Sequence, residues 1–450
     1  MEKWYQKAAD FIDNNKNEII EELKALVRIP SISQSGKDNF PFGKEVDKAL
    51  SAAAELYNKN GVPMQVNHKS GYALSVLDGE GDGIGIFGHA DVVPVNDDWV
   101  KTAPFEPIEE NGILYGRGIS DNKAAVVEAL YAILALRAAG VDLKSRITVY
   151  VGGSEETGMQ DILGFVQNER MPAVSITPDS DFPVSVGEKG ILHVYCRSKK
   201  PLCDILKFEG GKAFNVILDK VYVEANGGIS FTAEGLTSHA AHPEGSVNAA
   251  VVAAEKLCEL SICESDKEIL SNLIKAIGNY YGENLNIASE GAFGKLTCAN
   301  GIVKIEADKK LMFTLDIRYG NESDPKKLEQ NLASALSSLG FGCEIETNDE
   351  GFLLDENGKE MEIILSSCRE VANSPEAMPY KTYGGTYARR LKNAFAISHS
   401  APFDYSQLSL PAGHGGAHQS DEALSVSAYL DGIKTLALIL GRLDTHLTQK

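Results

Sequence analysis

Hydrophobic and polar positions follow two different periods along the first 190 residues. Segments with helical spacing, such as NEIIEELKALVR (17–28) and DNKAAVVEALYAILALRAAG (121–140), alternate with short apolar runs of the length of buried strands. These runs are YALSVL (72–77), IGIFGHADVVP (84–94), SRITVYVGG (145–153) and AVSITP (173–178). Because strands and helices alternate from about residue 70 to 186, the pattern predicts an α/β domain with a mixed, mostly parallel sheet flanked by helices.

The pattern changes between about residues 190 and 380. Segments such as KGILHVYCRS (189–198) and GIVKIEADKKLMFTLDIRYG (301–320) indicate antiparallel strands, with helices such as DPKKLEQNLASALSSLG (324–340) between them. After residue 380 the α/β pattern returns. We therefore predict a first domain in two parts, residues 1–189 and 381–450, with an inserted α+β domain at 190–380.

Polar side chains stand at the ends of three predicted strands of the first domain. His89 and Asp91 end one strand, Glu155 and Glu156 follow the next, and Asp179 follows the third. In α/β sheets, ligands bind beyond the carboxyl ends of the strands. These side chains are therefore expected in the same layer of the fold.

Each polar group also has an ordinary interpretation. Asp121, after the turn YGRGIS, could simply cap a helix, and adjacent glutamates could begin a solvated one. His418, in AGHGGAHQSDE, could belong to a flexible loop. Taken together, however, His, Asp and Glu without cysteine form a ligand set suited to Zn²⁺ or Mn²⁺.

Composition excludes several classes of partner. The formal net charge of −20 argues against nucleic acid and anionic membranes, which need basic patches. No apolar run approaches the roughly 20 residues of a membrane helix, and the N-terminus is typical of an amphipathic helix rather than a signal peptide. The seven cysteines form no C-x-x-C pair, which favours a reducing, cytoplasmic location.

The order of the motifs resembles that of a known family, the M20 metallopeptidases, and within it the bacterial dipeptidases of the PepV type. The resemblance runs over nearly the whole chain and is carried by GHADVVP, YGRGISDNK, GSEETG, TPDSDFPVSVGEKG, GLTSHAAHPEGSVNA, LDIRY and GGTYAR. It implies that the first domain is catalytic and that the inserted domain is a lid.

The resemblance also implies two divalent metal ions, Zn²⁺ or Mn²⁺. By this resemblance, His89 and Asp179 bind one ion, Glu156 and His418 bind the other, and Asp121 bridges them. The peptide bond after Asp121 is expected to be cis.

Three further residues are expected to serve catalysis. Asp91 should accept a hydrogen bond from His89 and so orient its ring. Glu155 is the expected general base for the water that the metals activate. His239 matches the histidine that stabilises the oxyanion, with His242 as the less favoured candidate.

Asn215, Arg318 and Gly385 match residues that hold the terminal carboxylate of a small dipeptide substrate, for which a guanidinium fork is suited. The segment 198–222 resembles the lid enlargement of PepV-type chains, so we expect a monomer.

Two alternatives stay open. A related N-acyl amino acid deacylase or desuccinylase would share the metal ligands and differ in the lid. An inactive binding protein on the same fold is disfavoured because Glu155 and all five ligand positions keep suitable residues.

Overall fold

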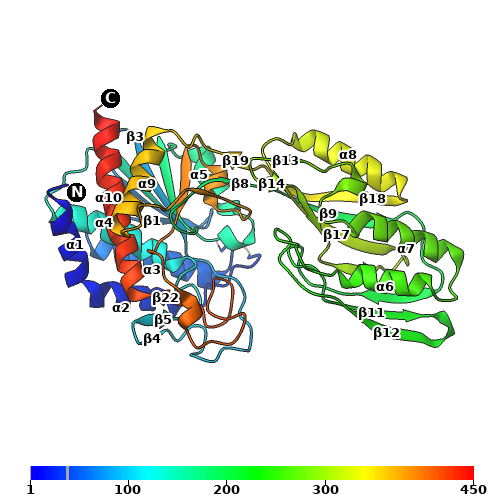
Figure 1. Cartoon of the computed structure of the whole chain (residues 1–450). Helices are drawn as coiled ribbons and strands as arrows, with labels where there is room; N and C mark the ends of the chain where they lie inside the picture. The colour runs from blue at the N-terminus through cyan, green and yellow to red at the C-terminus, as the bar shows by residue number, and fades with distance from the viewer. Residues whose placement is uncertain (1, 37–39, 450) are drawn as a thin grey trace. The chain divides into compact units, whose positions relative to one another are not determined.

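The computed structural model describes residues 2–36 and 40–449 as two compact units. The first comprises Met1–Val186, Leu354–Tyr380 and Thr386–Lys450, and the second comprises Gly187–Leu353 and Lys381–Gly385. Figure 1 shows the second unit in green and yellow, because it is made largely from the middle of the chain. The chain passes between the units at four points: 186/187, 353/354, 380/381 and 385/386.

A mixed sheet forms the centre of the first unit. Its strand order is β1-β2-β6-β3-β7-β21-β8, and the pairs β6–β3, β3–β7 and β7–β21 are parallel, whereas β1–β2, β2–β6 and β21–β8 are antiparallel. The strands are β1 (Gln65–Asn67), β2 (Tyr72–Leu77), β3 (Glu80–His89), β6 (Ser145–Gly152), β7 (Val174–Pro178), β8 (Val184–Glu188) and β21 (Ala394–Ile397). The short strands β19 (Phe352–Leu353) and β20 (Tyr380–Thr382) pair with β8, near the points where the chain changes unit.

Helices cover this sheet and bury most of the apolar core. They are α1 (Tyr5–Asn14), α2 (Lys16–Val27), α3 (Lys44–Lys59), α4 (Lys123–Ala138), α5 (Gln160–Asn168), α9 (Lys359–Val371) and α10 (Val426–Thr448). Nearly every side chain of α4 from Lys123 to Leu136 is buried, as expected of a helix that is apolar all round. In Figure 1, α10 runs beside α4, α1 and α9.

A small antiparallel sheet, β22-β5-β4, completes the first unit. Its strands are β4 (Ile108–Glu110), β5 (Ile113–Tyr115) and β22 (Ala423–Ser425). Short 3₁₀ turns lie at Glu155–Thr157, Tyr387–Arg390 and Tyr405–Gln407. The sheet brings the segment before α10 next to the segment before α4.

The second unit is an antiparallel α+β fold. One sheet has the order β15-β17-β9-β18, with β16 also paired to β17, and another has the order β10-β11-β12. The strands are β9 (Gly190–Ser198), β10 (Ile205–Glu209), β11 (Lys220–Ala225), β12 (Ile229–Glu234), β13 (Glu290–Gly291), β14 (Gly294–Lys295), β15 (Thr297–Ala299), β16 (Val303–Ile305), β17 (Leu311–Tyr319) and β18 (Phe341–Asp349). The helices are α6 (Ala249–Cys258), α7 (Glu264–Ile277) and α8 (Pro325–Ser338), with 3₁₀ turns at Asn226–Gly228 and Glu283–Leu285.

The predicted fold class is confirmed: a mixed α/β sheet flanked by helices, with an α+β insertion. The segment 354–380, which sequence analysis placed in the insertion, contacts the first unit instead. Arg442 of α10 donates to Ser367 of α9, and His446 lies 3.2 Å from Glu360. The expected N-terminal helix is two helices, which meet at Asn15.

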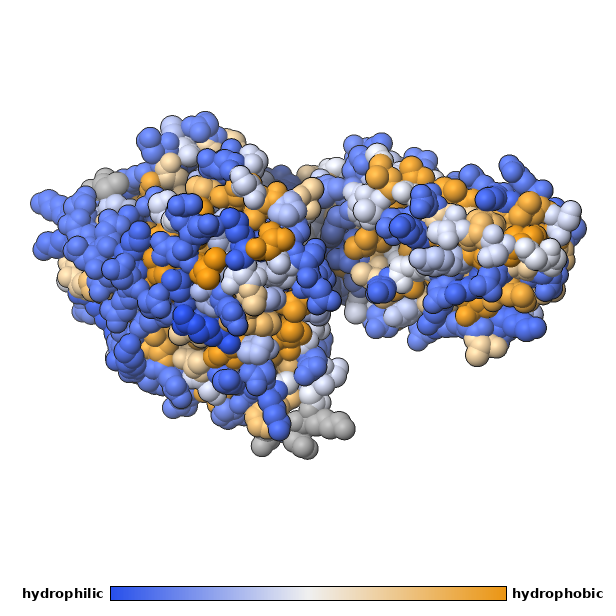
Figure 2. All heavy atoms as spheres, turned by 90° about the horizontal axis from the view of Figure 1, so that it is seen from below, coloured by the Kyte–Doolittle hydropathy of each residue, from blue (hydrophilic) through white to orange (hydrophobic). Residues whose placement is uncertain are grey.

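Among the described residues, no helix is both long enough and apolar enough to span a bilayer. On the face that Figure 2 shows, hydrophilic residues dominate and hydrophobic residues occur in small groups.

Candidate metal centre and active site

Three parallel strands of the first unit end side by side. His89, the last residue of β3, pairs with Gly152 at the end of β6. Ile86 of β3 pairs with Ile176 of β7. His89 lies three residues after Ile86, and Asp179 lies three residues after Ile176, directly beyond the end of β7. Because the three strands run parallel, side chains that follow them meet at one edge of the sheet.

Asp121 lies between two histidines. Its Oδ1 is 3.1 Å from Nε2 of His89, and its Oδ2 is 3.0 Å from Nε2 of His418. His418, from the loop before β22, also lies 3.0 Å from Oε2 of Glu156. Oδ2 of Asp179 lies 3.6 Å from Nε2 of His89. The five residues expected to bind metal thus lie together in the first unit, with Asp121 in the middle.

Asn122 joins the ends of two strands, a role that sequence reasoning missed. Its side-chain amide donates to the backbone oxygen of Pro178 (2.7 Å) and to Oδ1 of Asp179 (2.9 Å). Its Oδ1 accepts from the backbone nitrogen of His89 (3.2 Å). The Asp121–Asn122 peptide bond is cis, as the resemblance implied. The only signal in the sequence is the position of Asn122 directly after Asp121.

The carboxylate of Asp91 holds the turn that carries both glutamates. Its two oxygens accept hydrogen bonds from the backbone nitrogens of Glu155 and Glu156, each at 3.2 Å. Nδ1 of His89 lies 3.4 Å from Oδ1 of Asp91 and 3.0 Å from its backbone oxygen. Asp91 therefore contacts both His89 and the glutamate turn, and the second contact was not expected from the sequence.

Asp161 holds the backbone directly after β6. Its Oδ2 accepts from the backbone nitrogen of Gly153 (2.7 Å) and from the hydroxyl of Tyr387 (2.5 Å). A Cβ at Gly152 would lie only 1.8 Å from that hydroxyl oxygen, so the close approach requires glycine. The glycines of GGSEE thus allow the turn that presents Glu155.

The donor set fits divalent cations. Oε1 of Glu155 and Oε1 of Glu156 are buried and have no hydrogen-bond partner among the described residues, and Nε2 of His89 faces the carboxylates of Asp121 and Asp179. Donor atoms of His89, Asp121 and Glu156 lie within 4.8 Å of one another, and so do those of His89, Glu155 and Asp179. Buried polar atoms left unpaired are costly, and convergent nitrogen and oxygen donors are the ligands that Zn²⁺ and Mn²⁺ take.

Electrostatics in this cluster also favour a cation. Burial raises the pKa of Asp179 to about 7, and the charges of Asp121 and Glu156 raise it too. Burial raises the pKa of Glu156 to about 7, again with a contribution from Asp121. Burial raises the pKa of Glu155 well above its ordinary value, with further repulsion from its acidic neighbours. A positive ion would relieve the repulsion among these carboxylates.

The buried ion pair of Arg117 and Glu422 supports the backbone of Asp121. Sequence reasoning missed this pair. Glu422 accepts from Nη1 of Arg117 (2.8 Å) and from the backbone nitrogens of Gly118 (2.9 Å), Ser120 (2.8 Å) and Asp121 (2.9 Å). Both charged side chains are essentially inaccessible to solvent. Glu422 therefore fixes the whole turn that precedes α4.

The loop that carries His418 has an anchor of its own. Nδ1 of His414 lies 2.6 Å from Oδ2 of Asp421. Oδ1 of Asp421 accepts from the backbone nitrogens of Val100 (3.0 Å) and Lys101 (2.7 Å). The pair thus ties the loop of His418 to the segment before β4.

Two residues expected to contact substrate lie side by side in the second unit. The backbone oxygen of Asn215 accepts from Ala240 (2.9 Å), and Val216 forms a bridge with His239. Both Asn215 and His239 are exposed. Nδ1 of His239 accepts from the backbone nitrogen of Ala241 (3.1 Å), which fixes the ring.

Arg318 is held by a carboxylate from its own strand. Its Nε and Nη2 donate to Asp316 at 2.6 and 2.8 Å, and its Nη1 donates to the backbone oxygen of Tyr383 (3.1 Å). Nε2 of His193 lies 3.2 Å from the same Asp316, and the His193 ring stacks on Phe214 at 4.5 Å. Burial would raise the pKa of Asp316, but Arg318 and His193 lower it below its ordinary value. Asp316 and His193 were not singled out from the sequence.

The remaining candidates also lie in the second unit. The ring of His242 contacts Tyr383 edge to face, with 4.7 Å between ring centres. Gly385 follows two residues later, at the end of the short segment 381–385. Tyr383 therefore connects Arg318 with His242.

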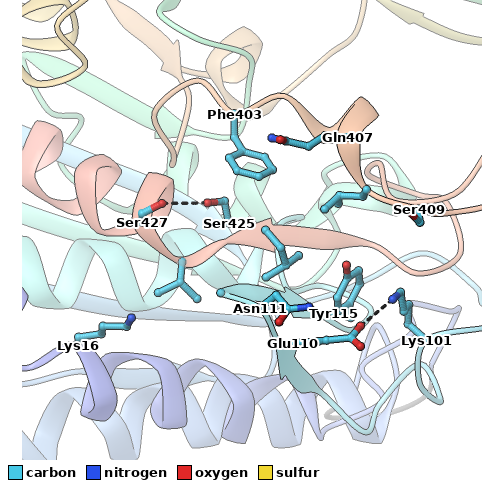
Figure 3. Close-up of a pocket in the computed structure, with 14 residues that line it drawn as sticks. Lys16, Lys101, Glu110, Asn111, Tyr115, Phe403, Gln407, Ser409, Ser425 and Ser427 are labelled. Atoms are coloured by element: carbon cyan, nitrogen blue, oxygen red, sulfur yellow. Dashed lines mark hydrogen bonds and ion pairs between the residues drawn. The ribbon is translucent and has the colours of Figure 1, made fainter.

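A separate pocket of about 520 Å³ lies in the first unit, between the small sheet and the start of α10 (Figure 3). Its lining includes the ion pair of Lys101 and Glu110 (2.6 Å), together with Lys16 and Phe403. None of the site residues predicted from the sequence is among the described residues that line it.

The fold and the donor set define a metal-dependent enzyme whose centre lies at the carboxyl edge of an α/β sheet. The model of peptidase family M20/M25/M40 matches residues 85–442, and the chain therefore belongs to this family of metallopeptidases.

Related bacterial sequences extend over nearly the whole chain. A protein of Staphylococcus epidermidis, provisionally named a dipeptidase, is 27% identical over 435 residues, which cover 88% of this chain and 91% of that protein. A Staphylococcus haemolyticus protein with the same provisional name is 25% identical over 484 residues, covering 97% of this chain and 99% of its own length.

Solved structures share the fold. The di-peptidase Dug1p from Saccharomyces cerevisiae has a TM-score of 0.64 at 14% identity, with 98% of both chains covered. Human carnosine dipeptidase 1 has a TM-score of 0.63 at 14% identity, with 99% of both chains covered. An M20 family metallo-carboxypeptidase from Sulfolobus solfataricus has a TM-score of 0.61 at 19% identity and covers 95% of this chain and 99% of its own.

Proposed function

We propose that this chain is a metal-dependent dipeptidase that hydrolyses dipeptides with a free N-terminus. One observation carries the proposal: donor atoms of His89, Asp121, Glu156 and Asp179 converge, and Glu155 beside them keeps a buried Oε1 without a partner among the described residues. The bacterial relatives that are provisionally named dipeptidases support the substrate class.

In this proposal the cluster holds two divalent cations, Zn²⁺ or Mn²⁺. His89 and Asp179 hold one, Glu156 and His418 hold the other, and Asp121 lies between them. When bound, such cations polarise a carbonyl oxygen and make water acidic enough to react at neutral pH. Oε1 of Glu156, which is buried without a partner among the described residues, is an atom that gains from this arrangement.

Glu155 acts as the general base. Its Oε1 is buried without a partner among the described residues, and Asp91 holds its backbone in place. It takes a proton from the attacking water and returns it to the amine that leaves. Because burial, together with its acidic neighbours, raises the pKa of Glu155, its carboxylate is a better proton acceptor than an ordinary one.

The second unit supplies the groups that recognise the substrate. Arg318 uses three of the five donors of its guanidinium on Asp316 and Tyr383, so two remain for a terminal carboxylate. Asn215 and Gly385 complete that contact, and His239 stabilises the tetrahedral oxygen. A clamp on the terminal carboxylate favours peptides of two residues.

A substrate panel separates this proposal from its alternatives. Chelated enzyme is restored with Zn²⁺ or Mn²⁺ and given dipeptides, N-acetyl amino acids and N-succinyl amino acids. Hydrolysis of dipeptides supports the proposal, whereas release of acetate or succinate alone indicates a deacylase or desuccinylase. Absence of any hydrolysis by fully metal-loaded protein indicates a binding protein.

The role of Glu155 is tested by Glu155→Gln. We expect kcat to fall by about 10²–10⁴-fold, as for loss of a general base, while the metal content stays unchanged. Glu109→Gln, on an exposed position of β4, is the charge-matched control and should keep full activity. Normal turnover by Glu155→Gln would contradict the assignment.

We also propose a monomer that works in the cytoplasm. All seven cysteines lie among the described residues and are free thiols, which supports a reducing compartment. The mass of the purified chain in solution, measured by light scattering, tests the monomer. A mass of twice 48.5 kDa would contradict it.

A further inference from the structure

Two thiols and a carboxylate meet in the second unit, in a part of the sequence that no motif covers. Donor atoms of Cys203, Cys263 and Asp266 lie within 4.8 Å of one another. Cys203 lies just before β10, whereas Cys263 immediately precedes α7 and Asp266 lies in the first turn of that helix. All three side chains belong to the second unit, so the group is independent of the cluster around Asp121.

Backbone hydrogen bonds hold this group in shape. Asp266 is fully buried, and its oxygens accept from the backbone nitrogens of Cys203 (2.9 Å), Asp204 (2.8 Å) and Ile205 (3.1 Å). Asp204 in turn accepts from the backbone nitrogen of Cys263 (2.7 Å). The loop of Cys203 is therefore fixed against the start of α7 by four such bonds.

The carboxylate keeps a donor position in spite of these bonds. Oδ2 of Asp266 accepts from the backbone nitrogens of Cys203 (3.2 Å), Asp204 (2.8 Å) and Ile205 (3.1 Å). Among the described residues, Oδ1 accepts only from the backbone nitrogen of Cys203 (2.9 Å), so Oδ1 keeps a lone pair for a ligand. A hydroxyl oxygen also stands nearby: that of Ser265 lies 3.2 Å from Sγ of Cys263 and 3.6 Å from Sγ of Cys203. The two sulfurs thus share one polar neighbour.

We propose that Cys203, Cys263 and Asp266 form a binding site for a soft divalent cation of the Zn²⁺ class. Thiolates select such ions, whereas hard ions such as Mg²⁺ prefer oxygen donors alone. In a tetrahedral site with Zn–S bonds of about 2.3 Å, the sulfurs stand about 3.8 Å apart. The donor atoms already lie within 4.8 Å of one another, so they have to approach by only about 1 Å. The hydroxyl of Ser265 or a water supplies the fourth ligand.

Disulfide formation is the competing chemistry for this pair of thiols. It requires an S–S distance of about 2.05 Å and therefore a much larger movement than cation binding does. Cation binding needs no oxidant: the two thiols release their two protons to solvent, and the cation takes their place. The exposed Cys203 and the half-exposed Cys263 leave the site open to solvent.

Cadmium reports on thiolate ligands directly, because a sulfur-to-Cd²⁺ charge-transfer band appears in the ultraviolet and histidine or carboxylate ligands give none. The full chain is reduced, chelated and titrated with Cd²⁺, and bound metal is counted by mass spectrometry of the native protein. We expect one thiolate-bound Cd²⁺ in the wild type. Cys203→Ser and Cys263→Ser should each abolish the band and bind one Cd²⁺ fewer.

Cys343→Ser, at a half-buried thiol of β18 in the same unit, is the matched control and should keep the band. Independently of the variants, Cd²⁺ should slow alkylation of Cys203 and Cys263 at least tenfold and leave that of Cys343 unchanged. Either absence of the band in folded wild type, or a Cys203–Cys263 disulfide without protection by Cd²⁺, overturns the proposal. These readouts do not depend on peptidase activity.

Discussion

Glu422 illustrates how a single buried residue supports the candidate site without belonging to it. It neutralises Arg117 and accepts three backbone nitrogens of the turn that ends at Asp121. A buried charge that loses its partner is far more costly than an exposed one. The geometry of Asp121 therefore depends on a residue about 300 positions away in the chain.

Glu422→Gln should destabilise the first unit by about 3–5 kcal/mol, because it leaves Arg117 buried without its counter-charge. Urea unfolding followed by circular dichroism measures this. The control is Glu362→Gln, which removes an exposed ion pair with Lys359 and should cost less than about 1 kcal/mol. Equal effects of the two substitutions would show that the buried pair does not stabilise the turn.

Glu128 of α4 is a buried acid with no hydrogen-bond partner for either carboxylate oxygen among the described residues. Burial raises the pKa of Glu128 well above its ordinary value. The folded state thus keeps a proton that the unfolded state releases above about pH 4.5, so the wild type should lose stability as pH rises through this value.

Glu128→Gln should remove this pH dependence, because the amide resembles the protonated acid and does not titrate. Above pH 4.5, we expect the free energy of unfolding of the variant, relative to that of the wild type, to rise by up to about 1.4 kcal/mol per pH unit. Chemical denaturation at pH 5, 6, 7 and 8 measures the difference. Parallel stability curves for the two proteins would contradict the prediction.

The sequence could indicate the residues that end strands, but not those that support them. His89, Glu155 and Asp179 each follow an apolar run, so the pattern itself directs attention to them. Glu422 and Asp421 act through turns brought together by the small sheet. Such contacts between distant segments leave no periodic signal in a single sequence.

At the scale of elements, α4 and the central strands were the most predictable features. A helix that is apolar all round and strands that are apolar throughout must both be buried, and the pattern shows both. The antiparallel pairing of β2 with β6 and the packing of α9 on α10 could not be predicted. Strand direction and helix partners depend on the path of the chain, which local periodicity does not record.

The N-terminus of α8 offers a test of a single element. Oδ1 of Asp324 accepts from the backbone nitrogen of Lys327 (2.8 Å), and Pro325 follows at the first helical position. Asp324→Ala should destabilise the second unit by about 1 kcal/mol, whereas Asp324→Asn, which caps equally well, should be nearly neutral. Thermal unfolding measures both, and equal losses would argue against capping as the cause.

At the scale of the whole molecule, the two units have separate apolar cores. A ligand that binds only the folded state stabilises it by about 2.7 kcal/mol at a concentration 100 times its Kd. Chelation should therefore lower the melting temperature of the first unit, where the candidate metal centre lies.

Scanning calorimetry with and without EDTA tests this expectation. Asp324→Ala identifies the transition of the second unit, because that transition alone should shift in the variant. Addition of Zn²⁺ or Mn²⁺ should restore the first transition. If chelation leaves that transition unchanged, metal binding by the cluster around Asp121 does not stabilise the first unit.

The packing of α10 against α4 and α1 also has a consequence for synthesis of the protein. On the ribosome, residues 187–353 emerge as one continuous stretch and can collapse while translation proceeds. The first unit is completed later, because β21 and α10 follow residues 187–353 in the chain. A nascent chain therefore holds β7 without its neighbour β21 until the whole second unit has been made.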